Sequence, residues 1–251
     1  SFVRRDLEIL ERHFTVKKTK IITYRVTKKG SDPLVFLRLL KGVLWADVVY
    51  SWFARWNAFF FVMFCMFLHK KCIIVVGGYE VAYVPQIDYG ALVSPSGRVV
   101  AKFILKHASK VLAVSKSNER EILRFTQPKR LKLVYNGVDT EKFKPSDTKE
   151  NLVVMVGTVS DSTMKLKGLE AFVRASTYLP DVQFVLIGKC EKRSVNRLKR
   201  MTGSNLKFTG YLSGEPLLRY YQRAKVYCQL SAHESFGVAL AEAMSCCCVP
   251  V

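Results

Sequence analysis

Acidic residues are scarce in this chain. Its 251 residues hold 20 Asp and Glu against 40 Lys and Arg, a formal net charge of +20. Residues 1–146 carry 26 basic and 11 acidic side chains, or +15, while the remainder carries 14 and 9, or +5. Such a basic first half attracts anionic partners, which include nucleic acid, acidic lipid headgroups and phosphorylated substrates. A merely solvated surface is the plainer alternative.

Long hydrophobic runs are absent as well. The longest unbroken apolar run covers residues 58–68, and as a helix it extends only about 16 Å, well short of a bilayer. We therefore expect a buried core helix here. An interfacial helix at a membrane surface is the alternative.

The seven cysteines show no disulfide framework and no metal-binding spacing. Three of them are consecutive, Cys246 to Cys248, and three adjacent side chains cannot all face one metal ion. No paired C-x-x-C or H-x-x-x-H accompanies them. We expect reduced, buried thiols in a cytoplasmic protein, with no metal site and no cofactor.

Several motifs of nucleotide and nucleic-acid binding are missing. No G-x-G-x-x-G follows an expected strand, which argues against a dinucleotide-dependent dehydrogenase, and no G-x-x-x-x-G-K-[ST] supports an ATPase. The basic residues are scattered, without a helix-turn-helix, a zinc ligand set or an aromatic RNA-binding motif. We therefore expect no nucleic-acid partner.

Strands and helices alternate throughout the chain. Apolar spacing predicts helices at residues 2–14, 34–44, 58–68, 99–108, 118–125, 168–179, 191–201, 215–223 and 236–244. Short apolar runs predict strands at residues 47–50, 72–76, 111–114, 131–135, 152–156, 183–187, 206–208 and 226–230. This alternation predicts an α/β fold of βαβ units, with parallel sheets flanked by helices in two Rossmann-like domains.

A polar segment at residues 142–151 separates the two halves and is the best candidate linker. The chain exceeds the length of one typical domain. We expect one domain at residues 1–146 and a second at residues 150–251. Both are expected to be incomplete, with the first strand before Ser1 and the last part of the second domain after Val251.

The residues after the expected strand at 226–230 are the best candidates for a ligand-binding site. Ligands of open parallel sheets bind beyond the carboxyl ends of the strands. Glu234 lies in the loop, and Ser235, Phe236 and Gly237 open a helix whose free N–H groups favour a phosphate. Gly237 removes a side chain where the backbone must approach a ligand. Glu242 lies about 9 Å along that helix from Phe236.

Two acids so placed can hold hydroxyl groups on either side of a diphosphate, and a carboxylate that accepts from a vicinal diol commonly fixes ribose. The alternative is that Glu234 only complements the helix dipole and that Glu242 is a solvated helix residue. Against this, Glu242 is flanked by Ala, Leu and Met, where an unpaired acid is costly to bury.

Four motifs, in order over about 120 residues, resemble those of one family. The segment Glu234 to Met244 reads ESFGVALAEAM and looks like the E-x7-E signature of retaining glycosyltransferases, particularly family 4. The segment Val134 to Pro145 reads VYNGVDTEKFKP and is similar to that family's entry into its second domain. Gly157 through Lys167-Gly168 resembles its phosphate loop, and Phe208 to Tyr211 its base-contacting turn.

The resemblance implies a GT-B fold and metal-independent transfer of a sugar from a nucleotide donor with retention. It implies that Glu242 binds the donor ribose, that Glu234 contacts the transferred sugar and the distal phosphate, and that Lys167 neutralises the diphosphate. Glu234 and Lys167 are the implied catalytic residues. The implied donor-binding residues are Gly157, Thr158, Lys165, Lys167, Tyr211, Leu212, Glu234, Ser235, Phe236, Gly237, Val238 and Glu242.

The chain departs from the family at three places. Thr158 stands where many relatives have Arg, and Lys165 is our candidate for the second positive charge. Cys247 replaces the usual Gly after the helix, so we expect strain there. The acceptor-side His of many relatives is not evident, and Glu80 is the candidate catalytic group in the comparable loop, with an ordinary loop acid as the alternative reading.

The resulting hypothesis is a retaining glycosyltransferase with a nucleotide-sugar donor and a glycan or lipid-linked acceptor. The basic first half and the aromatic helix favour a cytoplasmic protein in peripheral contact with an anionic membrane, at the inner face of the cell membrane. A nucleotide-sugar epimerase of the same architecture is the main alternative, because it binds the same donor.

Overall fold

The computed structural model describes residues 2–18 and 33–251 and divides the chain into two compact units, Ser1–Asn136 and Gly137–Val251. The division falls between Asn136 and Gly137, earlier than the expected linker. Residues 137–146 belong with the second unit because Phe143 is buried in its core, its ring centroid 6.2 Å from that of Tyr221. The expected linker also overlaps the next strand, which begins at Glu150.

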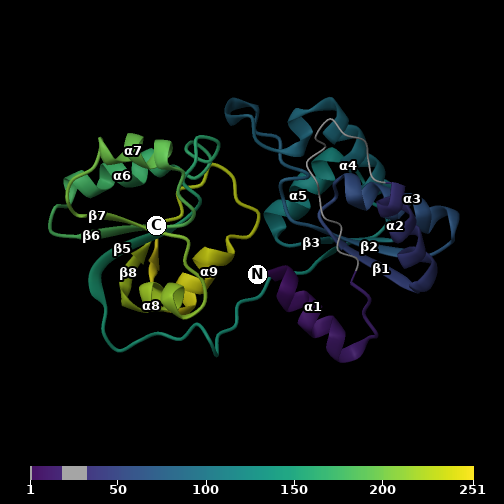
Figure 1. The fold of residues 1–251 in the computed structure, drawn as a ribbon, viewed down its shortest axis with the longest axis horizontal. Coiled ribbons are helices and arrows are strands. Elements are labelled where there is room, and N and C mark those ends of the chain that lie inside the picture. Colours follow the sequence, from purple (N-terminus) through teal and green to yellow (C-terminus); the bar gives the residue numbers. More distant parts are fainter. Residues whose placement is uncertain (1, 19–32) are drawn as a thin grey trace. The chain divides into compact units, whose positions relative to one another are not determined.

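The first unit contains a four-stranded parallel sheet in the order β1-β2-β3-β4 (Figure 1). Its strands are β1 (Val48–Trp52), β2 (Lys71–Val76), β3 (Lys110–Ala113) and β4 (Leu131–Leu133). Its helices are α1 (Phe2–His13), α2 (Pro33–Trp45), α3 (Trp56–Phe67), α4 (Pro95–His107) and α5 (Lys116–Phe125). Two short 3₁₀ helices, Pro85–Ile87 and Ala91–Val93, had no counterpart among the predicted elements.

The caps of this unit explain where two of its helices begin. The Ser94 hydroxyl accepts a hydrogen bond from the Gly97 amide at the start of α4. The Ser115 hydroxyl accepts from the Asn118 amide at the start of α5.

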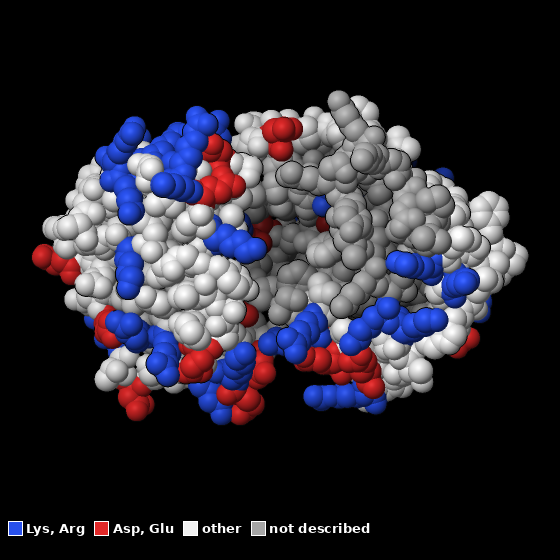
Figure 2. Space-filling model, viewed as in Figure 1, with Lys and Arg blue, Asp and Glu red and all other residues white. Residues whose placement is uncertain are grey.

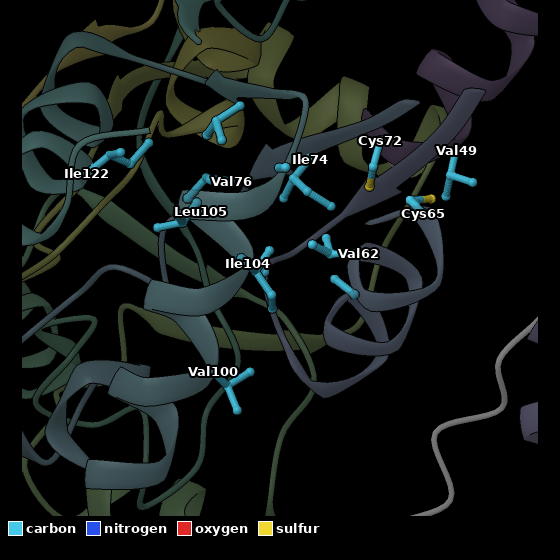
Figure 3. Close-up of a cluster of buried hydrophobic side chains, with 14 of the residues drawn as sticks. Val49, Val62, Cys65, Cys72, Ile74, Val76, Val100, Ile104, Leu105 and Ile122 are labelled. Carbon is cyan, nitrogen blue, oxygen red and sulfur yellow. The ribbon is translucent and has the colours of Figure 1, made fainter. Parts of the chain in front are cut away.

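One apolar core joins this sheet to α2, α3, α4 and α5 (Figure 3). Side chains from β1 and β2 meet those of α3 and α4 in the close-up, and Ile122 enters from α5. On α1, Asp6 accepts hydrogen bonds from the Tyr50 hydroxyl at 2.6 Å and the Trp52 indole nitrogen at 3.1 Å, which ties α1 to β1.

The aromatic segment expected at residues 58–68 is α3, and the core-helix reading is confirmed. Ala58, Val62, Phe64 and Cys65 are buried in the core of the unit. The helix ends on an exposed aromatic side chain, Phe67, which is 77% exposed. No helix in the described part of the chain is both long enough and apolar enough to span a bilayer.

The second unit contains a five-stranded sheet in the order β7-β6-β5-β8-β9, and all its strand pairs are parallel. The strands are β5 (Glu150–Val156), β6 (Gln183–Ile187), β7 (Leu206–Gly210), β8 (Ala224–Tyr227) and β9 (Val249–Pro250). The helices are α6 (Leu169–Tyr178), α7 (Lys192–Lys199), α8 (Glu215–Arg223) and α9 (Val238–Ser245).

Helices cover both faces of this sheet, with α6 and α7 on one side and α8 and α9 on the other (Figure 1). Side chains of β5 therefore alternate between two cores: Leu152 and Val154 pack toward α8 and α9, and Val153 and Met155 pack toward α6 and α7. A strand buried on both faces has to be apolar throughout, as residues 152–156 are. The α/β fold with two parallel sheets is confirmed.

Lys and Arg gather over α6 and α7 on the face drawn in Figure 2. The α7 helix contains four basic residues: Lys192, Arg193, Arg197 and Lys199. Part of the basic surface therefore lies on the second unit, although the sequence places most of the excess charge in the first half.

Candidate functional site

The candidate site lies where the sheet of the second unit changes direction. From β5 the chain continues to β6 and β7 on one side, then returns to β8 and β9 on the other, so β5 and β8 are adjacent at the switch point. Ligands of doubly wound sheets bind outside the carboxyl ends of the strands at this point. The loop after β5 contains Gly157 and Lys167, and the loop after β8 contains Gln229 and Glu234.

Glycines allow the loops at this edge to approach one another. A Cβ on Gly188, after β6, would overlap the carbonyl oxygen of Gly157, and Gly168 has φ 63° with its would-be Cβ 2.5 Å from the carbonyl oxygen of Leu230. A Cβ on Gly157 would lie 3.6 Å from Cγ of Lys167, an ordinary contact distance. These close approaches bring the loops after β5, β6 and β8 together.

Lys167 and Glu234 are joined across two of these loops. The Lys167 ammonium donates to Oε2 of Glu234 at 2.8 Å, and the two side chains are 24% and 35% exposed. The same carboxylate oxygen accepts a second hydrogen bond from the Gln229 amide at 3.0 Å. The sequence placed Lys167 and Glu234 in one site, and the structure brings them into direct contact.

The helix that follows Glu234 begins later than predicted. Residues 235–237 lie outside α9, which starts at Val238, and Gly237 forms its N-terminal cap with φ 75°. The expectation that Ser235 and Phe236 open the helix is therefore wrong: the left-handed backbone at Gly237 delays the first helical turn. Glu242 consequently lies about 6 Å along α9 from Val238, one turn into the helix rather than two.

Glu242 is half-buried and contacts the neighbouring helix. The hydroxyl of Tyr221, from α8, donates to Oε2 of Glu242 at 3.4 Å. Burial raises the pKa of Tyr221, and the charges of Tyr227 and Glu242 raise it further, so this hydroxyl stays protonated and remains a donor. Glu242 is therefore not fully solvated, and its role in ribose binding stays a prediction.

The far ends of α8 and α9 are held together by one ammonium group. Lys149 donates to the carbonyl oxygens of Tyr221 at 3.1 Å, Ala224 at 2.9 Å and Cys246 at 2.6 Å. Cations favour helix C-terminal ends, where carbonyl groups lack helical partners. Lys149 thereby fixes the base of the helix that carries Glu242.

The end of α9 shows the expected strain. Cys247 follows the cap residue Cys246 and has φ 59°, the left-handed conformation that usually requires Gly. Cys246 and Cys248 are buried and Cys247 is exposed, all three as free thiols. Burial raises the pKa of Cys246 to about 11, so this thiol is protonated and unreactive.

The remaining predicted donor-site residues lie around the same edge of the sheet. Thr158 and Lys165 are exposed in the loop after β5, and the Thr158 carbonyl accepts from the Thr163 hydroxyl at 2.7 Å.

Tyr211 follows β7, is 65% exposed and lies under the Lys189 ammonium, 5.9 Å from its ring centroid. Leu212 packs against the core of the unit. Ser235, Phe236 and Val238 are half-buried.

Glu80 lies in the first unit and has no exposed surface. Its Oε1 accepts from the backbone amides of Ala54 and Gly77, each at 3.1 Å, and so joins the loops after β1 and β2. Burial raises the pKa of this carboxyl, although the backbone hydrogen bonds oppose the rise. These contacts give Glu80 a structural task, and its catalytic role stays a prediction.

The sequence did not single out Gln229, Tyr227 or Tyr221. Gln229 lies two residues after the end of β8, but inside the strand predicted at residues 226–230, so it did not stand out as a loop residue. The two tyrosines are fully buried and read as ordinary core residues. Within residues 2–18 and 33–251, no group of three or more His, Cys, Asp or Glu side chains could hold a metal ion.

Known proteins resemble this chain in sequence. The family model described as glycosyl transferases group 1 matches residues 138–251. The sulfoquinovosyl transferase SQD2 of Arabidopsis thaliana is 27% identical over 65% of this chain and 34% of its own length. The GDP-mannose:cellobiosyl-diphosphopolyprenol alpha-mannosyltransferase of Xanthomonas campestris is 26% identical over 73% of this chain and 50% of its own length. The chain thus spans between a third and a half of these relatives.

Solved structures resemble it in fold. Anabaena Alr3699/HepE, crystallised with UDP and glucose, gives a TM-score of 0.72 at 16% identity over 86% of this chain and 62% of that one. The sucrose-phosphate synthase of Thermosynechococcus elongatus gives 0.67 at 18% identity over 86% and 60%. Residues 138–251 therefore resemble the glycosyl transferases group 1 family, and the chain shares the α/β fold of these solved structures.

Proposed function

We propose that the chain is part of a retaining glycosyltransferase, which moves a sugar from a nucleotide-sugar donor to an acceptor hydroxyl without a metal ion. The contact between Lys167 and Glu234 at the switch point carries this proposal, because it joins a cation and an acid where a diphosphate and its sugar would bind. The family match of the same unit supports it.

Different residues of the site bind different parts of the donor. Glu242, backed by Tyr221, holds the ribose hydroxyls; Tyr211 and Leu212 hold the base; and the backbone around Gly237 and Val238 faces the phosphates. Gly157, Thr158, Lys165, Ser235 and Phe236 complete the donor site.

The transfer itself needs no protein nucleophile. The bond between the anomeric carbon and the diphosphate oxygen breaks as the acceptor oxygen bonds to the same face of the sugar. The acceptor proton passes to the departing diphosphate. Lys167 stabilises the negative charge that develops on this leaving group, and Glu234 orients the sugar, so positioning and electrostatics supply most of the rate.

The donor is identified by thermal shift with UDP-, GDP- and ADP-sugars, since a ligand stabilises the state that binds it. The catalytic assignment is tested by donor turnover with Lys167→Ala and Glu234→Ala, each expected to reduce turnover about 100-fold or more. Product analysis with and without an acceptor separates a transferase from an epimerase, which converts the donor alone.

The matched control is Glu150→Ala. Glu150 forms a more exposed ion pair with Arg223, at 2.6 and 2.8 Å, at the opposite end of β5. This variant should retain wild-type turnover. Wild-type turnover by Lys167→Ala and Glu234→Ala would overturn the site assignment.

We propose further that the acceptor is lipid-linked and that the first unit contacts an anionic membrane surface. Two relatives are named for lipid-linked acceptors, one for a diphosphopolyprenol and the other for phosphatidylinositol. The chain offers a matching surface at the end of α3, where exposed Met66 and Phe67 precede His69, Lys70 and Lys71. Aromatic and basic side chains together suit the headgroup layer.

Flotation with vesicles of neutral or acidic lipid tests this contact. The wild-type chain should bind acidic vesicles at low salt and lose them at high salt, and Phe67→Ser with Lys70→Glu should bind more weakly. Absence of binding at low salt would remove the membrane proposal without affecting the transferase proposal.

A further inference from the structure

We propose that Gln229 is a positioning residue for Glu234 and that the buried hydroxyl of Tyr227 fixes the orientation of Gln229. The kinetic consequences of this inference rest on the proposed transferase function. Its structural content concerns the second unit alone and can be measured without a substrate.

The three side chains form a continuous chain of hydrogen bonds at the carboxyl end of β8. The Tyr227 hydroxyl donates to Oε1 of Gln229 at 3.2 Å. The Nε2 group of Gln229 donates to Oε2 of Glu234 at 3.0 Å and to the Ser231 hydroxyl at 2.7 Å. All the polar atoms of the Gln229 amide are therefore engaged.

The tyrosine determines which end of the amide faces the acid. An amide can present either its oxygen or its nitrogen to a neighbour, and only the nitrogen can donate to a carboxylate. Because the Tyr227 hydroxyl donates to Oε1, Nε2 is directed toward Glu234. Without that hydroxyl the amide could rotate and place its oxygen against the acid, which is repulsive.

Tyr227 is suited to this task by its surroundings. It has no exposed surface, and its ring packs against that of Tyr221, with centroids 6.0 Å apart. Burial raises the pKa of Tyr227, and the charges of Glu234 and Glu242 raise it further although a backbone hydrogen bond to Val156 opposes them. The hydroxyl is therefore protonated throughout the physiological range, and its position is fixed by the core.

The hydrogen bond from Gln229 to Glu234 is most important when Lys167 binds the diphosphate. Lys167 and Gln229 both donate to Oε2 of Glu234, and Lys167 is also the residue proposed to neutralise the diphosphate. A diphosphate that attracts the ammonium weakens its bond to the acid. The amide donor then keeps the carboxylate directed at the sugar, which is a transition-state task and predicts an effect on kcat more than on the KM for the donor.

Kinetics of Gln229→Met, Tyr227→Phe and the double variant test the proposal. Loss of one hydrogen bond to a charged group corresponds to about a 10- to 100-fold lower kcat for Gln229→Met, with a smaller loss for Tyr227→Phe. Since the hydroxyl acts through the amide, the double variant should be no slower than Gln229→Met alone. Gln229→Glu, which replaces the donor by an acid, should lose more than Gln229→Met.

Two controls match these changes in chemistry. Tyr178→Phe removes a hydroxyl from a surface tyrosine, and Gln183→Met alters an exposed glutamine at the amino end of β6. Both should keep wild-type kinetics. Multiplicative losses in the double variant, or a kcat within twofold of wild type for Gln229→Met, would overturn the positioning role.

The free protein gives an independent measurement. The side-chain NH₂ signals of Gln229 in a ¹⁵N spectrum should shift in both Tyr227→Phe and Glu234→Ala and stay unchanged in Tyr178→Phe. If neither variant moves them, the hydrogen-bond chain does not exist. If they move as expected and no donor is turned over by the wild type, the transferase proposal fails while the arrangement of the three side chains stands.

Discussion

Each unit places a glutamate in a loop after a parallel strand, and the two acids have opposite surroundings. Glu80 is fully buried and accepts hydrogen bonds from the backbone amides of Ala54 and Gly77. Glu234 is partly exposed and accepts from the side chains of Lys167 and Gln229. A buried acid bonded to backbone amides fixes local structure. An accessible acid bonded to movable side chains can exchange them for a ligand.

The largest expected effect is on stability, which should fall when Glu80 is replaced but not when Glu234 is replaced. Glu80→Ala leaves two amides without their acceptor and a cavity, so the free energy of unfolding of the first unit should fall by about 2–4 kcal/mol. Glu234→Ala should leave it unchanged. All three tryptophans, Trp45, Trp52 and Trp56, lie in the first unit, so a urea titration followed by tryptophan fluorescence reports on it. If the two variants unfolded at the same urea concentration, the proposed difference between the two acids would be wrong.

A pair of lysines extends the contrast within the second unit. Lys149→Met removes a cation from three carbonyl groups and should destabilise α8 and α9 by about 2 kcal/mol. Lys167→Met loses a partly exposed ion pair and should cost less than about 1 kcal/mol while abolishing turnover. Hydrogen exchange of the α9 amides measures the first effect. Unchanged exchange in Lys149→Met would contradict the anchoring role.

A pH series sharpens the description of Glu80. Its pKa is raised in the folded state, and the unfolded carboxyl ionises near its reference pKa of about 4.3. Its contribution to the free energy of unfolding is therefore fully present below that pH and declines as the pH rises through the folded-state pKa. Glu80→Gln has no ionisable carboxyl and lacks this decline. Its free energy of unfolding, measured by tryptophan fluorescence, should therefore rise relative to that of the wild type from acidic to neutral pH. A constant difference would show that folding does not raise the pKa of Glu80.

The smallest effect concerns Cys247. A residue with a Cβ in the left-handed region costs about 1 kcal/mol, part of which the greater freedom of Gly in the unfolded chain cancels. Cys247→Gly should raise the free energy of unfolding of the second unit by about 0.5 kcal/mol. Urea denaturation followed by far-UV circular dichroism measures it. Cys190→Gly, at an exposed position with no positive φ, serves as the control and should not stabilise.

Patterns with a local cause could be predicted from the sequence. Apolar strands buried on both faces predicted the order of elements, and Cys247, in place of the usual Gly, marked a strained helix end. The start of α9 was misplaced because the left-handed backbone at Gly237 depends on how the preceding loop packs. Glycine alone does not distinguish a helical position from a cap.

The candidate site was foreseen in its acids and its lysine but not in what holds them. Lys167 and Glu234 belong to motifs that the sequence displays. The partners Gln229, Tyr227 and Tyr221 make contacts set by strand register and helix packing, which no local spacing reveals. Burial of Glu80 likewise follows from the adjacency of β1 and β2 rather than from its loop sequence.

The packing of Gly188 on the Gly157 carbonyl has a practical consequence for engineering. Any side chain at Gly188 would displace the loop that carries Lys167, so saturation of this position should yield inactive proteins whatever donor is offered. Thr158 and Tyr211 are exposed on the same rim, and no such backbone constraint applies to them. A library intended to alter donor preference should therefore vary the rim and leave the glycine pair untouched.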